Sequence, residues 1–153
     1  TVSSGNCSFA YGRRISGTNT EAHGDNSAAF CGGCIADAQN SFAAGQKTLS
    51  KGVMSSSFGN NTIAAGRSSF VIGQYNVEDT EEISDHGTGA HKYLFIVGNG
   101  TNANSRSNAM TLDWNGNIVC NNIPAPPTSN GNYQLTCSVN NGVVTYSWAP
   151  IPN

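Results

Sequence analysis

The chain has 153 residues, enough for one ordinary domain, and only 10% of them are charged. Its net charge of −2 lacks the positive excess that binding to nucleic acid needs, so we expect no nucleic-acid partner. No apolar run reaches the length of a membrane span and no signal peptide is visible, so we expect no membrane insertion. The chain begins at Thr1 rather than at Met, which indicates a fragment or a processed product.

Residues 7–76 form a degenerate repeat whose unit reads Ser-x-Ala-x-Gly. The closing glycines lie mostly about seven or about fourteen residues apart, and an internal period of this kind sets the fold before any single residue does. The copies, some of them loose, are Ser8–Gly12, Thr20–Gly24, Ala28–Gly32, Ser41–Gly45, Ser55–Gly59, Thr62–Gly66 and Ser69–Gly73.

The repeat predicts a coil of very short β-strands. Alternation within the first unit sends Ser8, Ala10 and Gly12 to one face and Phe9 and Tyr11 to the other. Glycine ends each strand where the chain must turn through φ values that other residues resist. One coil is expected to take about fourteen residues and to stack on the next at about 4.8 Å. We expect the larger apolar residues to be buried within or between the coils: Phe9, Phe42, Phe58, Ile63 and Phe70.

Beyond the repeat, residues 78–92 are predicted to form an exposed loop, because the segment is acidic and contains glycine. Five of the nine acidic residues lie between positions 78 and 85. Strands are predicted over residues 93–97, 109–114 and 118–120. Asn115-Gly116 gives the best short-range signal for a hairpin between the last two of them.

Residues 123–132 are predicted to be a linker, since their three prolines favour extended backbone. Strands over residues 133–139 and 143–148 then form a terminal hairpin, which needs a partner because a lone hairpin is marginal in water. The chain is therefore predicted to be all-β, with a repeat region (1–77), a loop and strand segment (78–122), a proline-rich linker (123–132) and a C-terminal hairpin (133–153).

Three runs of the middle segment resemble tail-fibre and minor structural proteins of phages and prophages of Gram-positive bacteria: Ile96–Thr101, Arg106–Ala109 and Leu112–Asn117. In that family the segment follows a β-roll repeat through a Gln-x-Tyr-Asn-x-Glu-Asp-Thr link, which Gln74–Thr80 matches. The repeat also resembles the β-roll heads of trimeric autotransporter adhesins. The resemblance covers about residues 7–122 and departs from the family in a longer insertion over residues 83–92. The terminal hairpin resembles C-terminal tags of the same phage proteins.

The resemblance implies a homotrimer in which each chain forms a left-handed β-roll or solenoid. It also implies a non-catalytic structural and receptor-binding part of a phage tail fibre, made in the host cytoplasm and carried on the virion. The implied partners are identical copies of the chain, a glycan or protein receptor on the host surface, and other virion tail proteins. The alternatives are the head of a trimeric adhesin on a bacterial surface and a tailspike polysaccharide depolymerase.

Amide and aromatic side chains suit sugar hydroxyls, and two groups of them are candidates for ligand binding. The first group surrounds a polar, turn-rich run and comprises Tyr93, Asn99, Asn102, Arg106 and Trp114. The second group, Tyr146 and Trp148, lies on the terminal hairpin, where exposed aromatic residues would form a receptor contact. The alternatives are a surface loop satisfied by its own Asx turns and packing between three copies of the hairpin.

The cysteines are odd in number and lack the spacing of a secreted disulfide framework, which predicts free thiols formed in a reducing cytoplasm. Cys31 and Cys34 have the spacing of a redox or metal motif. They are not followed by a predicted helix and are not matched by a second ligand pair, so they are interpreted as small residues of the coil. The five are Cys7, Cys31, Cys34, Cys120 and Cys137.

No metal, cofactor or catalytic residue is predicted. Asp85, His86 and His91 offer ligand atoms for a metal, but exposed loop histidines are the simpler interpretation. Glycoside cleavage needs two carboxylates at a fixed separation, whereas the acidic residues of 78–85 lie on one loop. Asp113 is predicted to cap the turn that contains Asn115-Gly116. The sequence has no Gly-x-Ser-x-Gly elbow, and the chain is predicted not to be an enzyme.

Overall fold

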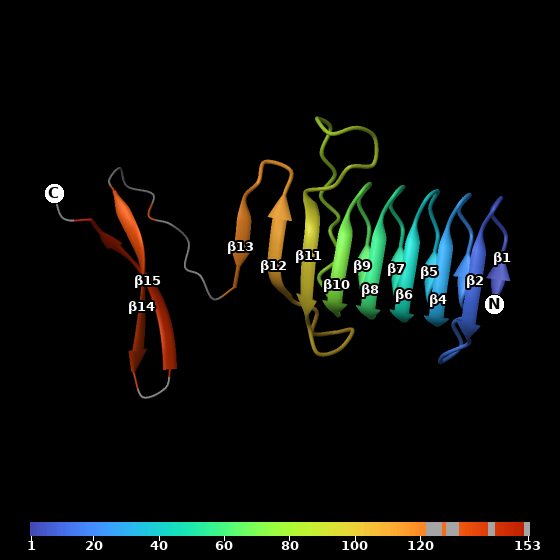
Figure 1. The fold of residues 1–153 in the computed structure, drawn as a ribbon, viewed down its shortest axis with the longest axis horizontal. Helices are drawn as coiled ribbons and strands as arrows, with labels where there is room; N and C mark the ends of the chain where they lie inside the picture. The colour runs from blue at the N-terminus through green and yellow to red at the C-terminus, as the bar shows by residue number, and fades with distance from the viewer. Residues whose placement is uncertain (122–126, 128–131, 141–142, 152–153) are drawn as a thin grey trace. The chain divides into compact units, whose positions relative to one another are not determined.

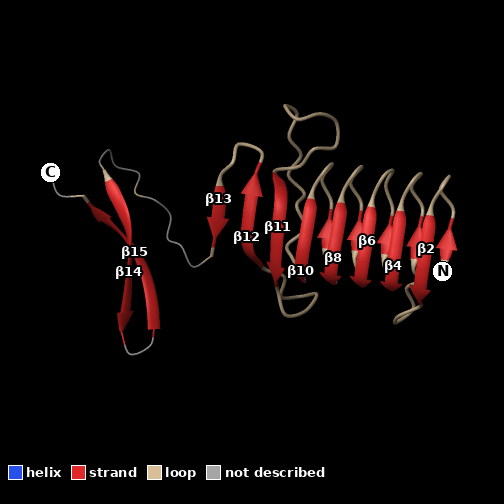
Figure 2. Ribbon diagram, viewed as in Figure 1, coloured by secondary structure: helices blue, strands red, loops and turns tan. Residues whose placement is uncertain are grey.

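The computed structural model describes residues 1–121, 127, 132–140 and 143–151. Over these residues the chain consists of strands and connecting segments without a helix, so the predicted all-β class is confirmed (Figure 2). It divides into two compact units, Thr1–Ile118 and Val119–Asn153. Within the described part of the chain no helix has the length and hydropathy needed to cross a membrane. The predicted linker over 123–132 falls almost entirely outside the described residues.

The repeat supplies parallel strands to two sheets, which the chain visits alternately (Figure 1). We call them the long sheet and the short sheet, after the lengths of their strands. The repeat strands of the long sheet are β2 (Phe9–Arg13), β4 (Ala28–Gly32), β6 (Phe42–Gln46), β8 (Ser56–Asn60) and β10 (Phe70–Gln74). The short sheet contains β1 (Val2–Ser3), β3 (Glu21–Ala22), β5 (Ile35–Ala36), β7 (Leu49–Ser50) and β9 (Ile63–Ala64).

The strands of the long sheet pair in register at a fixed interval. Ala28 lies opposite Phe42, Phe42 opposite Ser56, and Ser56 opposite Phe70, so one repeat takes 14 residues and supplies one strand to each sheet. The predicted period is therefore confirmed. The first interval, from Phe9 to Ala28, is longer, because an additional turn bridged between Ile15 and Thr18 is inserted there.

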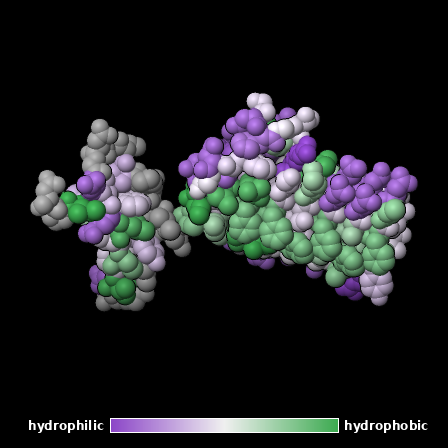
Figure 3. Space-filling view, turned by 45° about the horizontal axis from the view of Figure 1, so that its top comes forward, coloured by the Kyte–Doolittle hydropathy of each residue, from purple (hydrophilic) through white to green (hydrophobic). Residues whose placement is uncertain are grey.

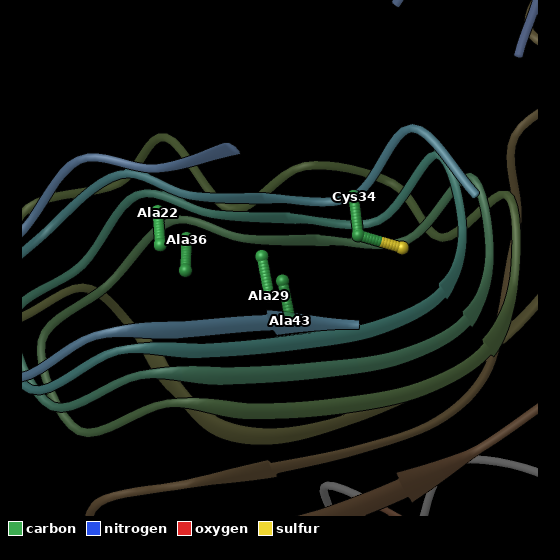
Figure 4. Close-up of a cluster of buried hydrophobic side chains, with 5 residues drawn as sticks. All are labelled: Ala22, Ala29, Cys34, Ala36 and Ala43. Atoms are coloured by element: carbon green, nitrogen blue, oxygen red, sulfur yellow. The ribbon is translucent and has the colours of Figure 1, made fainter. Parts of the chain in front are cut away.

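Small side chains fill the space between the two sheets. Ala22, Ala29, Cys34, Ala36 and Ala43 are fully buried there, and Figure 4 shows alanines of the two sheets pointing toward one another. Hydroxyl groups are buried as well, and several of them bond to one another or to the backbone, whereas Ser27 Oγ and Thr48 Oγ1 have no hydrogen-bond partner among the described residues. The Oγ atoms of Ser50 and Ser57 lie 2.8 Å apart, and Thr20 Oγ1 donates a hydrogen bond to the Cys31 carbonyl oxygen at 2.7 Å.

The phenylalanines lie on the outer face of the long sheet. The predicted alternation within β2 is confirmed, but Phe9 and Phe70 are 52% and 41% exposed, and Phe42 and Phe58 are half-buried. The prediction that the large apolar residues would be buried within or between the coils is therefore wrong for Phe9 and Phe70. Phe42 and Phe58 are covered in part by each other, with ring centres 5.2 Å apart and ring planes 27° apart. Ile63 is half-buried and lies opposite Leu49 in the short sheet.

The last three repeat strands of the long sheet have a positive φ at the same position. Gly45, Gly59 and Gly73 have φ values of 126°, 117° and 96°, as the repeat predicts, whereas the other closing glycines, Gly12, Gly24, Gly32 and Gly66, do not have a positive φ. In β4 the equivalent residue is Cys31, with φ of 76°, because Cys31 and not Gly32 lies opposite Gly45. A Cβ added at Gly59 would lie 2.0 Å from the carbonyl oxygen of Gly73. Glycine therefore allows neighbouring strands to approach closely.

The long sheet continues beyond the repeat. β11 (Tyr93–Asn99) pairs in parallel with β10, β12 (Asn108–Asp113) pairs antiparallel with β11, and β13 (Ile118–Cys120) follows β12 in the sheet order. The strands predicted over 93–97, 109–114 and 118–120 are confirmed. The pairing of β10 with β11 carries one sheet across the expected boundary at residue 77.

The second unit contains the predicted terminal hairpin. β14 (Tyr133–Asn140) and β15 (Val143–Pro150) pair antiparallel, with Leu135 opposite Trp148 and Cys137 opposite Tyr146. Residues directly opposite one another share a face, so this face of the hairpin is largely apolar. The turn predicted around residues 141–142 lies outside the described residues.

Replacing Gly59 by alanine is expected to destabilise the first unit by about 3 kcal/mol, since the new Cβ would collide with backbone while φ stays positive. Gly17→Ala is the matched control: φ is 86°, but nothing lies within 4 Å of the added Cβ, so the expected loss is about 1 kcal/mol. Urea unfolding followed by circular dichroism, at one protein concentration, measures both losses. Equal losses would contradict the close-approach argument.

Candidate functional site

The loop between β10 and β11 is tied to the start of β11 by a buried carboxylate. Asp79 is 7% exposed and accepts backbone hydrogen bonds from Glu81 at 3.2 Å and from Tyr93 at 2.7 Å. Its carbonyl oxygen lies 2.6 Å from His91 Nδ1. The prediction of an exposed loop holds for residues such as Glu82, whose side chain is 79% exposed, but it is wrong for Asp79.

Trp114, directly after β12, lies against this loop. Its indole Nε1 donates a hydrogen bond to the His91 carbonyl oxygen at 2.8 Å. Its ring stacks on the His86 ring, with 4.8 Å between centroids and 28° between planes. The loop therefore fixes both the polar edge and one face of the indole. A cleft of about 200 Å³ opens beside it, lined by Glu81, Ile83, Asp85, His86, Lys92, Asp113, Trp114 and Asn115.

The charged groups around this cleft, which we call the Trp114 cleft, are paired. Lys92 Nζ lies 2.9 Å from Glu81 Oε2 and 5.6 Å from the centre of the Tyr93 ring. The hydrogen bond to Glu81 is the main cause that raises the pKa of Lys92. His86 Nδ1 lies 3.1 Å from Asp85 Oδ1, and His86 lowers the pKa of the Asp85 carboxyl.

Asp113 caps the turn after β12, as the sequence predicts. Its carboxylate accepts hydrogen bonds from the backbone N–H of Asn115 at 2.9 Å and of Asn117 at 2.8 Å. It also accepts one from the side-chain amide of Asn117 at 2.8 Å. These bonds, led by that of the Asn117 side chain, lower the pKa of Asp113. A carboxylate bound in this way shapes the rim of the Trp114 cleft.

β11 separates the predicted ligand-binding residues into two groups. Tyr93 begins this seven-residue strand and is adjacent to the Trp114 cleft, whereas Asn99 ends it, about 20 Å away. Asn102 lies near that far end, in a short turn where its Oδ1 accepts a hydrogen bond from the backbone N–H of Asn104 at 2.9 Å. The predicted amide and aromatic residues therefore do not form a single site.

Arg106 is committed to the end of the repeat. Its Nη1 donates hydrogen bonds to the carbonyl oxygens of Asn61 and Asn76, both at 3.0 Å. Its guanidinium carbon lies 5.8 Å from the centre of the Tyr75 ring. These contacts hold the link between β10 and β11, and a ligand-binding role for Arg106 stays a prediction.

Asn76 is the residue that sequence reasoning missed. It is fully buried, its Oδ1 accepts a hydrogen bond from the Ile63 N–H at 2.8 Å, and its Nδ2 donates one to the Ile63 carbonyl at 3.0 Å. The side chain thus takes the place of a further strand beside β9. The sequence did contain a signal for the buried position of Asn76, because Thr48, Thr62 and Asn76 follow one another at the 14-residue period of the repeat.

The other candidates belong to other elements of the chain. Tyr146 and Trp148 are on β15 in the second unit, and Tyr146 is 41% exposed. All five cysteines have free thiols, as predicted. Cys34 is buried with its Sγ 3.1 Å from the Gly45 carbonyl oxygen, while Cys31 is exposed. Over the described ranges, no three His, Cys, Asp or Glu side chains gather to hold a metal ion.

No protein-family model, curated protein or solved structure matches this chain. The Trp114 cleft combines an indole, an ammonium group and carboxylates in a shallow hollow, which suits contact with a polar, uncharged ligand such as a sugar. Each of Glu81, Asp85 and Asp113 already has a partner within the chain. The cleft is therefore the candidate functional site, and the interpretation that fits it best is ligand contact.

Replacing Asp79 by alanine is expected to lower the free energy of opening the loop by about 2 kcal/mol, because the Tyr93 N–H loses its acceptor at a partly buried position. Trypsin cleavage after Lys92 should become about tenfold faster or more, since cleavage follows the population of the opened loop. Glu82→Ala is the control, because that side chain is 79% exposed and approaches His91 only to 4.0 Å. Similar rates for the two variants would contradict the bracing role of Asp79.

Proposed function

We propose that the chain is a homotrimeric fibre module, with each chain forming a left-handed β-roll, that serves as a non-catalytic receptor-binding part of a phage tail fibre. It attaches multivalently to a host cell surface, with a glycan as the receptor. The resemblance of the repeat and of the middle segment supports this proposal. The free thiols are consistent with synthesis in a host cytoplasm before assembly into the virion with other tail proteins.

One observation carries the proposal: the phenylalanine side chains lie outside the stacked repeats, and the interior holds mostly small ones, with Val71 and Ile96 as larger buried residues at its end. Ala29 and Ala43 are fully buried, whereas Phe9 and Phe70 remain about half exposed. A stack of this kind satisfies its backbone through strand pairing, but it buries little apolar surface within one chain. Association with identical chains provides the burial that a single chain lacks.

The mechanism is avidity. Three chains present three identical Trp114 clefts at fixed separations, so the second and third contacts form at a high effective concentration. A weak contact in each cleft is then sufficient for firm attachment. The apolar face of the terminal hairpin, with Tyr146 and Trp148, is proposed to pack against its own copies.

Light scattering after size-exclusion chromatography is expected to give a solution mass three times that of the 15.9 kDa chain. The same preparation should bind Gram-positive host cells and leave their purified wall polysaccharide intact. A monomeric mass would contradict the fibre proposal. New reducing ends after incubation with the polysaccharide would favour a depolymerase over an attachment protein.

Lys92→Gln is expected to weaken cell binding by about fivefold or more, because a small loss at each cleft is multiplied across three of them. Lys51→Gln is the matched control, since Lys51 also forms a surface ion pair, with Glu78 at 2.7 Å, but does not line the cleft. Cell-binding titrations with labelled protein measure both effects. Equal binding by the two variants would remove the Trp114 cleft from the proposal.

A further inference from the structure

Four neighbouring strands of the long sheet, β6, β8, β10 and β11, each end in an amide side chain. In-register pairing places these residues directly opposite one another, so they form one row across the strands. We call them the amide row; the pairs in order are Gln46 with Asn60, Asn60 with Gln74, and Gln74 with Asn99. Asn99 is thereby joined to three residues that share its chemistry.

Toward β2 the amide row continues through a gap to a cation. Gly32, at the end of β4, lies opposite Gln46, and Arg13, at the end of β2, lies opposite Gly32. Because Gly32 has no side chain, the row is interrupted there, and a groove of about 580 Å³ opens. We call it the Arg13 groove; the side chains that line it are those of Tyr11, Arg13, Ile15, Cys31 and Gln46.

An insertion in the repeat builds one wall of the Arg13 groove. From Phe9 to Ala28 the repeat takes 19 residues, whereas from Ala28 to Phe42 it takes 14. Figure 1 shows the extra turn, in blue, beyond the arrowhead end of β2. A Cβ added at Gly32 would lie 2.1 Å from Ile15 Cδ1, so Ile15 of this turn lies directly against Gly32. Insertions into a repeat often line its binding face.

The polar groups of the row and the groove are not used within the chain. Gln46, Gln74 and Asn99 make no side-chain hydrogen bond among the described residues, so the row is not an internal amide ladder. Over the same part of the chain Arg13 has no ion pair. Tyr11 is 71% exposed, and its ring contacts no other aromatic ring that the structure describes. All these groups are therefore open to a ligand.

The backbone at Cys31 gives an independent indication. The equivalent residue of β6, β8 and β10 is glycine, whereas Cys31 keeps an exposed side chain at a φ of 76°. A left-handed φ in a residue other than glycine costs about 1 kcal/mol or more, and such strain collects at functional sites. A side chain is thus kept in the groove at a position where glycine would fit more easily.

The chemistry of these groups suits an anionic sugar chain. Primary amides both donate and accept hydrogen bonds, as sugar hydroxyls do. The exposed ring of Tyr11 offers a face to a sugar ring, and the guanidinium of Arg13 pairs with a carboxylate or a phosphate.

A sugar chain also matches the border on which the amide row lies. The outward residues of β6, Phe42 and Ala44, are apolar, and Gln46 at its end is polar. Figure 3 shows hydrophobic residues forming a band along the first unit, with hydrophilic residues along its borders. Sugar rings present apolar faces and polar edges, so they can contact both sides of such a border.

Two other kinds of polymer fit less well. A nucleic-acid strand carries one phosphate per 3.4 Å or so, and over the roughly 24 Å from β2 to β11 it would bring about seven charges to one arginine. A peptide that adds to a sheet needs unpaired backbone groups, but each strand of the amide row is paired on both sides.

We infer that the Arg13 groove and the amide row bind one extended anionic glycan chain. Its carboxylate or phosphate lies at Arg13, one sugar ring lies on Tyr11, and its hydroxyl groups follow the amides. The inference rests on the glycan receptor of the proposed function and adds a second contact to the Trp114 cleft. A glycan long enough to engage both contacts of one chain binds more firmly than either contact allows alone.

The first test is calorimetric titration with oligosaccharides of galactose, galacturonic acid and galactose 6-phosphate, matched in length. The better of the two acidic forms should bind about tenfold more tightly than the neutral form, because only an anion pairs with Arg13. It also identifies whether the bound group is a carboxylate or a phosphate. Arg13→Gln should abolish the preference. Arg14→Gln is the matched control, since Arg14 is exposed and carries the same charge but does not line the groove.

The second test locates the ligand without any substitution. Cys31 lines the groove, whereas Cys7 is exposed elsewhere, so the two thiols form an internal comparison. The acidic oligosaccharide, at about ten times its Kd, should slow the alkylation of Cys31 by iodoacetamide about tenfold, as mass action requires. Alkylation of Cys7 should stay unchanged. Mass mapping of the cysteine peptides measures both rates.

Equal affinity for acidic and neutral oligosaccharides, absence of any binding, or an unprotected Cys31 would each overturn the inference and leave the trimer and the Trp114 cleft standing. An equal loss of preference in Arg14→Gln would reduce the effect to net charge and would also overturn it. A monomeric chain in which Cys31 is protected would support the groove and contradict the trimer of the proposed function.

Discussion

The structure of the first unit depends on how closely one repeat can approach the next. At Gly59 there is room for a hydrogen atom only, since a Cβ would lie 2.0 Å from the Gly73 carbonyl oxygen. The same restriction applies at Gly45, where the contact atom is the carbonyl oxygen of Gly59 at 2.1 Å. A chain stacked in this way keeps small residues at fixed intervals, and low charge and abundant glycine follow from that requirement rather than from disorder.

The same spacing explains where the large side chains go. Alternation along a strand puts Phe42 and Ala43 on opposite faces, and the space between the two sheets accepts the alanine. The aromatic residue is left outside, where it stacks on rings of the neighbouring strands. A single chain therefore carries on its surface the apolar residues that most domains bury. The proposed trimer resolves this by making the outside of each chain the inside of the assembly.

The sequence predicted the period, the strand positions and the turn cap of Asp113, because each depends on neighbouring residues or on a regular interval. It did not predict which face of the strands would be internal. Phe42 and Ala43 alternate in the same way in either orientation, and the usual preference for burying phenylalanine pointed to the wrong one. The roles of Asp79 and Arg106 depend on contacts across 14 and 45 residues, which no local pattern encodes.

The position of the Trp114 cleft follows from how the repeat ends. Asn76 replaces a strand beside β9, so the short sheet stops there while the long sheet continues into β11 and β12. The chain between Asn76 and β11 no longer forms a repeat. It folds back against Trp114 and is held at the start of β11 by the hydrogen bond from the Tyr93 N–H to Asp79. Most residues that line the cleft therefore belong to this loop, which the hydrogen bonds of Asp79 and Trp114 tie to the paired strands. In the proposed trimer this attachment matters, because three weak contacts reinforce one another only when their separation is fixed.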